Sequence, residues 1–103
     1  MAQFVIVYLG GNHPDNPEKQ KKHFIEYKKW LASLGNSIMS PMNPLKNTKT
    51  VKSDGSVTNS SSTLMSGYTI IQADSIEKAL KITKSCPFLK IGGTLEVSEL
   101  VQM

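Results

Sequence analysis

Few side chains in this sequence could carry acid–base chemistry, and the best placed of them is His23. It lies in the stretch KHFIEYKKW, whose apolar spacing is helical. Histidine titrates near neutral pH, so His23 could act as a general base at the rim of a pocket between a helix and a sheet. The alternative is a half-exposed histidine that packs against Trp30. No carboxylate at a convincing partner position can be named from the sequence, and both interpretations stay open.

The single cysteine, Cys86, is the other candidate nucleophile. It directly precedes Pro87, which cannot continue a helix, so Cys86 lies where a helix ends. Reactive thiolates favour a helix N-terminus or a cationic neighbour, and the C-terminal end of a helix carries the opposite dipole sign. Lys84 is the only argument on the other side. Cys86 is therefore predicted to be a small buried apolar residue.

Two features of the first loop suggest ligands only weakly. His13 and Asp15 are both able to bind a metal, but no ligand spacing recurs and the neighbouring prolines already explain a loop. The pair at Gly10 and Gly11 lacks the spacing of known phosphate-binding loops. We expect no metal and no cofactor.

Several side chains combine an apolar body with a polar or adaptable tip and could line a small-molecule pocket: Tyr8, Tyr27, Tyr68, Met39 and Met42. Ordinary core packing is the competing interpretation, because protein interiors are generally filled. If the gap between helix and sheet holds a ligand, we expect Tyr8, Tyr27, Met42 and Tyr68 to contact it.

Composition restricts the class of protein. The 103 residues suit one domain, and a net charge of +4 raises the question of nucleic acid. All 12 basic residues are lysines, which are scattered along the chain, and aromatic residues are few. Without arginine or a stacking surface, nucleic-acid binding is disfavoured. The first apolar run, residues 4–9, is too short to cross a membrane, and a reducing, cytoplasmic location is expected.

The elements that would position these side chains follow from periodicity and turn signals. The pattern predicts strands at 3–9, 37–45, 67–73 and 93–101, helices at 17–34 and from Asp74 to just before Pro87, and a hairpin at 49–58. Asn16 is the expected N-cap of the first helix, and Asp74 that of the second, with Glu77 completing a capping box. A two-residue turn is expected at residues 54–55. The predicted buried stripes are Phe24, Tyr27, Leu31 and Leu34 in the first helix and Ile76, Ala79, Leu80 and Thr83 in the second.

This order of elements predicts an α+β domain, a ferredoxin-like split βαβ arrangement with an inserted hairpin. Two helices cover only one face of a four-stranded antiparallel sheet, yet the first strand is apolar on both faces. A second copy of the chain would cover the other face in a two-fold dimer. Glu96 and Ser98 on that face of the last strand favour a partly hydrated interface.

The C-terminal half carries a family resemblance. It shows Gly67-Tyr68, a cap at Asp74, Cys86-Pro87 and the strand GGTLEV at residues 92–97. Residues 43–45, Asp54-Gly55 and Val57-Thr58 fit as well. In these features the chain resembles the YCII-related (DGPF-type) proteins over most of its length, as a single domain at 1–103. The DGPF tetrad itself is missing, and the serine-rich residues 59–62 take its place.

The resemblance implies a dimeric α/β barrel, a superfamily that includes small monooxygenases, isomerases, dehalogenases and heme-handling proteins. It also implies a catalytic His–Asp pair whose histidine lies on the first helix, where His23 corresponds. Residues 32–36 offer no aspartate as its partner. Two functions remain open: binding or turnover of a small organic molecule in a helix–sheet pocket of a dimeric barrel, or a non-catalytic dimeric adaptor or sensor.

Overall fold

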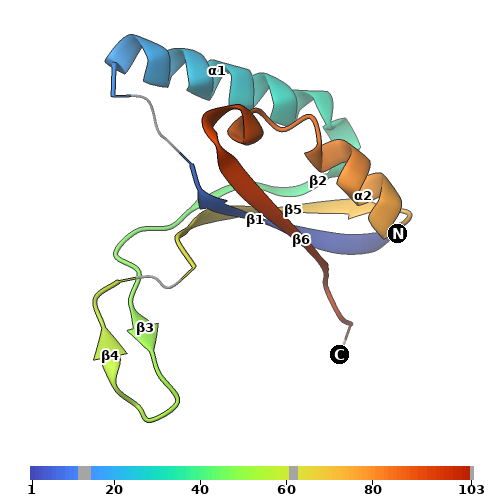
Figure 1. Cartoon of the computed structure of the whole chain (residues 1–103). Helices are drawn as coiled ribbons and strands as arrows, with labels where there is room; N and C mark the ends of the chain where they lie inside the picture. Colours follow the sequence, from blue (N-terminus) through green and yellow to red (C-terminus); the bar gives the residue numbers. More distant parts are fainter. Residues whose placement is uncertain (12–14, 61–62, 103) are drawn as a thin grey trace.

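The computed structural model describes residues 1–11, 15–60 and 63–102. In this part of the chain, four strands form one antiparallel sheet in the order β2-β5-β1-β6. Both α-helices lie on the same side of it (Figure 1). The strands are β1 (Ala2–Gly10), β2 (Ile38–Pro44), β5 (Met65–Ala73) and β6 (Gly93–Glu99); the helices are α1 (Pro17–Ser33) and α2 (Ile76–Thr83); two 3₁₀ turns are η1 (Gly35–Ser37) and η2 (Pro87–Ile91). The predicted α+β class and the split βαβ order are confirmed.

The two faces of the sheet differ as strand alternation predicts. On β1, Phe4 and Ile6 point toward the helices and are fully buried, as is Ile71 on β5. The intervening Val5 and Val7 are only half-buried. We call the side away from the helices the open face; pairing with β1 places these side chains on it: Val5, Val7, Tyr68, Ile70, Glu96 and Ser98. The predicted division of β6 into an apolar and a polar face is confirmed.

Helix α1 begins as predicted. The Asn16 side chain accepts hydrogen bonds from the backbone N–H groups of Glu18 and Lys19, and Pro17 occupies the first turn. Gly35, which follows the helix, has φ +52°, a left-handed conformation that glycine adopts without strain. None of the described helices is long and apolar enough to cross a membrane.

The predicted buried stripe of α1 is partly wrong. Leu31 is buried, but Phe24 is 44% exposed and Trp30, placed on the flank by the sequence, is only 6% exposed. The Trp30 indole N–H donates to the Ser85 hydroxyl at 3.0 Å, so this face of the helix is held against the segment after α2. Phe24 lies closer to the start of the helix, where it borders an open cavity rather than the core.

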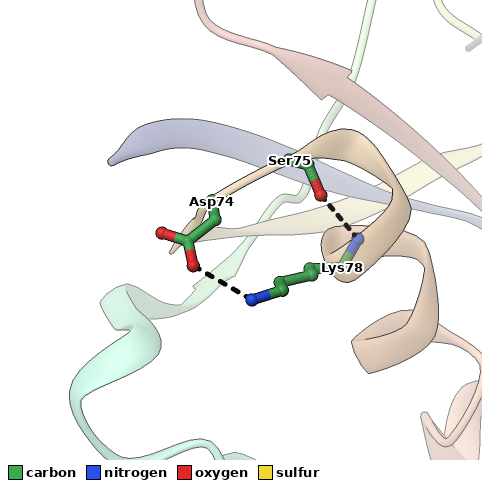
Figure 2. Close-up of polar contacts among 3 residues, drawn as sticks. All are labelled: Asp74, Ser75 and Lys78. Atoms are coloured by element: carbon green, nitrogen blue, oxygen red, sulfur yellow. Dashed lines mark hydrogen bonds and ion pairs between the residues drawn. The ribbon is translucent and has the colours of Figure 1, made fainter.

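The cap of α2 is Ser75, not Asp74 as predicted. The Ser75 hydroxyl accepts a hydrogen bond from the backbone N–H of Lys78 at 3.3 Å (Figure 2). Asp74 lies one position too early to cap, and its carboxylate pairs instead with the Lys78 ammonium at 3.0 Å. The predicted capping box with Glu77 is therefore absent from this described helix, because its spacing was counted from the wrong residue.

Only half of the predicted stripe of α2 is buried. Ala79 and Thr83 are almost completely covered, whereas Ile76 and Leu80 are 36% and 42% exposed. This helix has only eight residues, and it contacts β5, β1 and β6 mainly through Ala79, Ile82 and Thr83. The sequence predicts a broader apolar stripe on this helix, and it does not indicate which residues of that stripe pack against the sheet.

The inserted hairpin consists of β3 (Thr50–Val51) and β4 (Val57–Thr58), and it projects away from the helix side of the sheet (Figure 1). Its turn has three residues between the Lys52–Ser56 pair, not the predicted two. Gly55 takes φ +87°, as expected where a three-residue loop ends in a left-handed residue. Asp54 rigidifies the loop by accepting hydrogen bonds from the backbone N–H and the hydroxyl of Ser56.

Candidate functional site

A cavity of about 460 Å³ lies between α1, the adjoining ends of β2 and β5, and η2. Its walls are mainly aromatic and apolar, with a few polar side chains. It is lined by Tyr8, Gln20, His23, Phe24, Tyr27, Met42, Asn43, Pro44, Ser66, Gly67, Tyr68 and Phe88. His23 and the four expected ligand contacts thus border the same space, whereas Met39, also considered from the sequence, does not line it. Their role in binding stays a prediction.

Tyr27, Tyr8 and Thr69 form a chain of hydrogen bonds at this cavity. The Tyr27 hydroxyl donates to the Tyr8 oxygen at 2.8 Å, and Tyr8 lies 2.6 Å from the Thr69 hydroxyl. Thr69 donates to the Pro41 carbonyl at 2.6 Å. We call this series, from Tyr27 to the Pro41 carbonyl, the hydroxyl ladder. It connects α1 with three strands, so the position of Tyr27 is set by the sheet.

Ring–ring contacts also fix the positions of Tyr8 and Tyr27. The rings of Tyr8 and Tyr27 meet edge to face with centroids 5.8 Å apart, and Tyr8 meets Phe88 at 5.3 Å in a similar geometry. Tyr27 stacks on Trp30 at 6.0 Å. Such pairs stabilise by about 0.5–1.5 kcal/mol beyond burial, so the cavity wall is preorganised.

Tyr8 is kept protonated by its surroundings. Burial raises its pKa well above the ordinary value, because the charged phenolate would lose its hydration. A phenolate at this position would lie in an apolar environment. Tyr8 therefore remains a neutral hydroxyl at physiological pH.

His23 lies on α1 at the cavity rim and is half-buried. Within the described residues, its imidazole forms no hydrogen bond or ion pair. Trp30, which the sequence suggested as its packing partner, turns its N–H toward Ser85. The structure thus brings His23 to the cavity without a group that orients it.

Tyr68 stands apart from the other candidates. It pairs with Val7 on β1, while its neighbours Gly67 and Thr69 are buried on the helix side. Strand alternation therefore directs the Tyr68 side chain toward the open face. Its backbone lies at the cavity wall, where the carbonyl accepts a hydrogen bond from Asn43 at 3.2 Å.

Four further residues belong to this site although the sequence did not point to them: Phe24, Asn43, Thr69 and Phe88. Phe88 is buried to 6% exposure and packs across Gly93, where an added Cβ would overlap its ring. The glycine at position 93 was the sequence signal for this contact, because a residue without a side chain leaves room for a neighbouring ring. Thr69 could have been found from alternation, because it lies on the same face as the buried Ile71.

Cys86 lies outside this cavity and is almost completely buried. Burial raises the pKa of its thiol to about 11, so the thiolate is scarce at neutral pH. This confirms the prediction of a buried apolar residue. The candidate metal ligand His13 lies outside the described residues. Among those described, no group of three or more histidine, cysteine, aspartate or glutamate side chains is arranged to hold a metal ion.

Comparisons with known proteins agree with this architecture. The family model described as YCII-related domain matches residues 1–103. The solved structures include a similar chain, 5-chloro-2-hydroxyhydroquinone dehydrochlorinase (TftG) from Burkholderia phenoliruptrix AC1100 in complex with 2,5-dihydroxybenzoquinone. The match has 17% identity and a TM-score of 0.61, and covers 98% of this chain and 95% of TftG, so it shows a shared fold. The search of curated proteins finds no match.

Proposed function

Because the chain belongs to the YCII-related family, we propose that it binds a small organic molecule in the cavity between α1 and the sheet. One observation carries this proposal: an aromatic cavity of about 460 Å³ with a few fixed polar groups is the usual form of a small-molecule site. The similar fold of TftG, which was solved with a hydroxylated quinone, supports it. We place the protein in the cytoplasm, where its single thiol stays reduced.

His23 is the proposed general base if the molecule is turned over. It borders the cavity from α1, and it is the histidine on the first helix that the family resemblance points to. In enzymes without a bound substrate, catalytic hydrogen bonds are often formed only in the complex. A substrate hydroxyl or an ordered water would then supply the partner that His23 needs.

A non-catalytic adaptor or sensor is the second proposal. It is favoured by the lack of an orienting carboxylate at His23 among the described residues, since a positioned base normally has one. In this case the cavity binds its ligand and the complex signals through the surface. Both proposals share the cavity and differ only in chemistry.

We further propose that a second copy of the chain covers the open face. Val5, Val7 and Ile70 are only half-buried there, and both helices lie on the other side of the sheet (Figure 1). Aligned apolar side chains of this kind usually mark an interface. Glu96 and Ser98 at the margin fit an interface that retains water.

The function is tested by ligand screening with matched variants. Small aromatic alcohols, quinones and carboxylic acids are screened by thermal shift against the parent chain, His23→Ala and the exposed control Lys22→Ala. Ligands that stabilise the parent and the control but not His23→Ala support a site at this rim. Chromatography with mass spectrometry of each bound compound after incubation then separates the two proposals, since turnover changes its mass or its retention. If no compound stabilises the parent chain, the binding proposal is wrong.

The dimer is tested by light scattering of the parent chain and of Val7→Glu. We expect the parent to have twice the mass of one chain and the variant to be monomeric, because the added charge would be buried. Lys78→Glu, on the exposed side of α2, is the control and should stay dimeric. A monomeric parent at micromolar concentration would contradict the proposal.

A further inference from the structure

We propose that Tyr27 is a specificity-determining residue that accepts a hydrogen bond from the ligand. The cavity would then select aromatic molecules that carry a phenolic hydroxyl or an amine over those that carry only carbonyl or ether oxygens. This inference rests on the proposed binding function. It follows from the direction in which the protons of the hydroxyl ladder are donated.

The ladder is anchored at a group that can only accept. The Pro41 carbonyl has no proton, so the Thr69 hydroxyl must donate in their 2.6 Å contact. A threonine hydroxyl has one proton to give. Thr69 therefore has only its oxygen lone pairs left for its other neighbours.

This anchor sets the direction of every other bond. Tyr8, 2.6 Å from Thr69, must be the donor in that pair, and burial keeps it protonated. Tyr27 then donates to Tyr8 at 2.8 Å, and in its longer 3.3 Å contact with Thr69 it can only share the same proton. Tyr27 thus gives its single proton to the interior. What it leaves for a molecule in the cavity is an oxygen lone pair.

Two further polar side chains of the cavity wall, those of Asn43 and Ser66, also donate their protons to other groups of the protein. The Asn43 amide nitrogen donates to the Ser40 hydroxyl at 2.9 Å and to the Tyr68 carbonyl at 3.2 Å. The Ser66 hydroxyl donates to the Tyr8 carbonyl at 3.3 Å. The sheet side of the cavity therefore offers acceptors. Gln20 and His23 line the cavity from α1, the same helix that carries Tyr27.

A ligand acceptor gains little at Tyr27. To receive its proton, the ligand would have to replace the Tyr8 oxygen, and neither Tyr8 nor Thr69 can reverse to compensate. A ligand donor adds a bond and breaks none. One neutral hydrogen bond corresponds to about a three- to tenfold difference in dissociation constant.

The test uses five single-ring probes: phenol, aniline, anisole, benzaldehyde and toluene. Each is titrated into the full chain, and dissociation constants are measured from amide chemical shifts of residues around the cavity. We expect phenol and aniline to bind about three- to tenfold more tightly than anisole and benzaldehyde. Toluene, which neither donates nor accepts, reports on the aromatic walls alone.

The decisive variant combines Tyr8→Phe with Thr69→Val. It removes both acceptors of the Tyr27 proton, which becomes available to the cavity, so benzaldehyde and anisole should gain on phenol and the preference should shrink or reverse. Thr69→Ser is the matched control, because serine keeps one donor and the same acceptor and should keep the preference.

The outcomes distinguish the acceptor role of Tyr27 from the binding function of the cavity. Binding of toluene with no preference for phenol over anisole in the parent chain would overturn the acceptor role of Tyr27 and leave the cavity function standing. An undiminished preference in the Tyr8→Phe, Thr69→Val double variant would also overturn it. If none of the five probes binds, the proposed function fails and this inference fails with it.

Discussion

Replacing Gly93 with alanine should destabilise the protein by forcing the Phe88 ring out of place. A Cβ at Gly93 would overlap Cε2 and Cδ2 of Phe88 and lie 2.8 Å from its Cζ. The ring has little room to move, since it is 6% exposed and packs 5.3 Å from the Tyr8 ring between centroids. On another side the ring lies close to Gly11, where an added Cβ would come within 3.0 Å of Phe88 Cζ.

The magnitude follows from two opposing effects. Overpacking a filled site costs about 1–3 kcal/mol, and the confinement of Phe88 favours the upper half of this range. Alanine also restricts the unfolded chain, which returns about 0.4–1 kcal/mol. We therefore expect the free energy of unfolding to fall by about 2 kcal/mol, which lowers Tm by about 8–16 °C for a chain of this size.

The assay is urea unfolding of four proteins: the parent, Gly93→Ala, Phe88→Leu and the double variant. Leucine removes the ring that the new methyl group would meet, so the double variant should recover at least about 1 kcal/mol relative to the sum of the single changes. Unfolding energies that add, or a Gly93→Ala protein as stable as the parent, would refute the reasoning. Phe88 also lines the cavity, so Gly93→Ala should weaken ligand binding as well.

Three more predictions concern single groups. The Cys86 thiol has its pKa raised to about 11 in the folded protein, so the unfolded chain loses the thiol proton first; stability should fall as the pH rises from about 9 toward 11, and Cys86→Ala should remove this part of the slope in pH-dependent urea unfolding. Ser75→Ala should lower the free energy of unfolding by about 1 kcal/mol, because it removes the cap of α2. Asp74→Ala removes only an exposed ion pair and should lower it by less than about 0.5 kcal/mol in the same urea assay. Equal losses in the two variants would contradict the assignment of the cap. The hydrogen bonds from Ser56 hold the pKa of Asp54 below its usual value, and an NMR titration of Ser56→Ala should show it rising; an unchanged Asp54 titration would argue against those bonds.

Local sequence signals determined the elements of this protein and the order in which they occur. Asn16-Pro17 and Gly35 set the ends of α1 because capping and left-handed geometry depend on neighbouring residues alone. Alternation placed the apolar residues of β1 on both faces, and the order of elements then restricted the sheet to one topology. The end of α2 before Cys86 was also predictable, because a proline follows this cysteine directly.

Tertiary structure alone decided which apolar side chains are covered and which polar groups meet. Phe24 and Trp30 both lie near the apolar side of α1, and only the packing of the folded chain buries one and leaves the other at the cavity. The hydroxyl ladder joins residues 8, 27, 41 and 69, which are far apart in the chain. No local pattern encodes such a contact, because the direction of its hydrogen bonds depends on strand register and helix placement together.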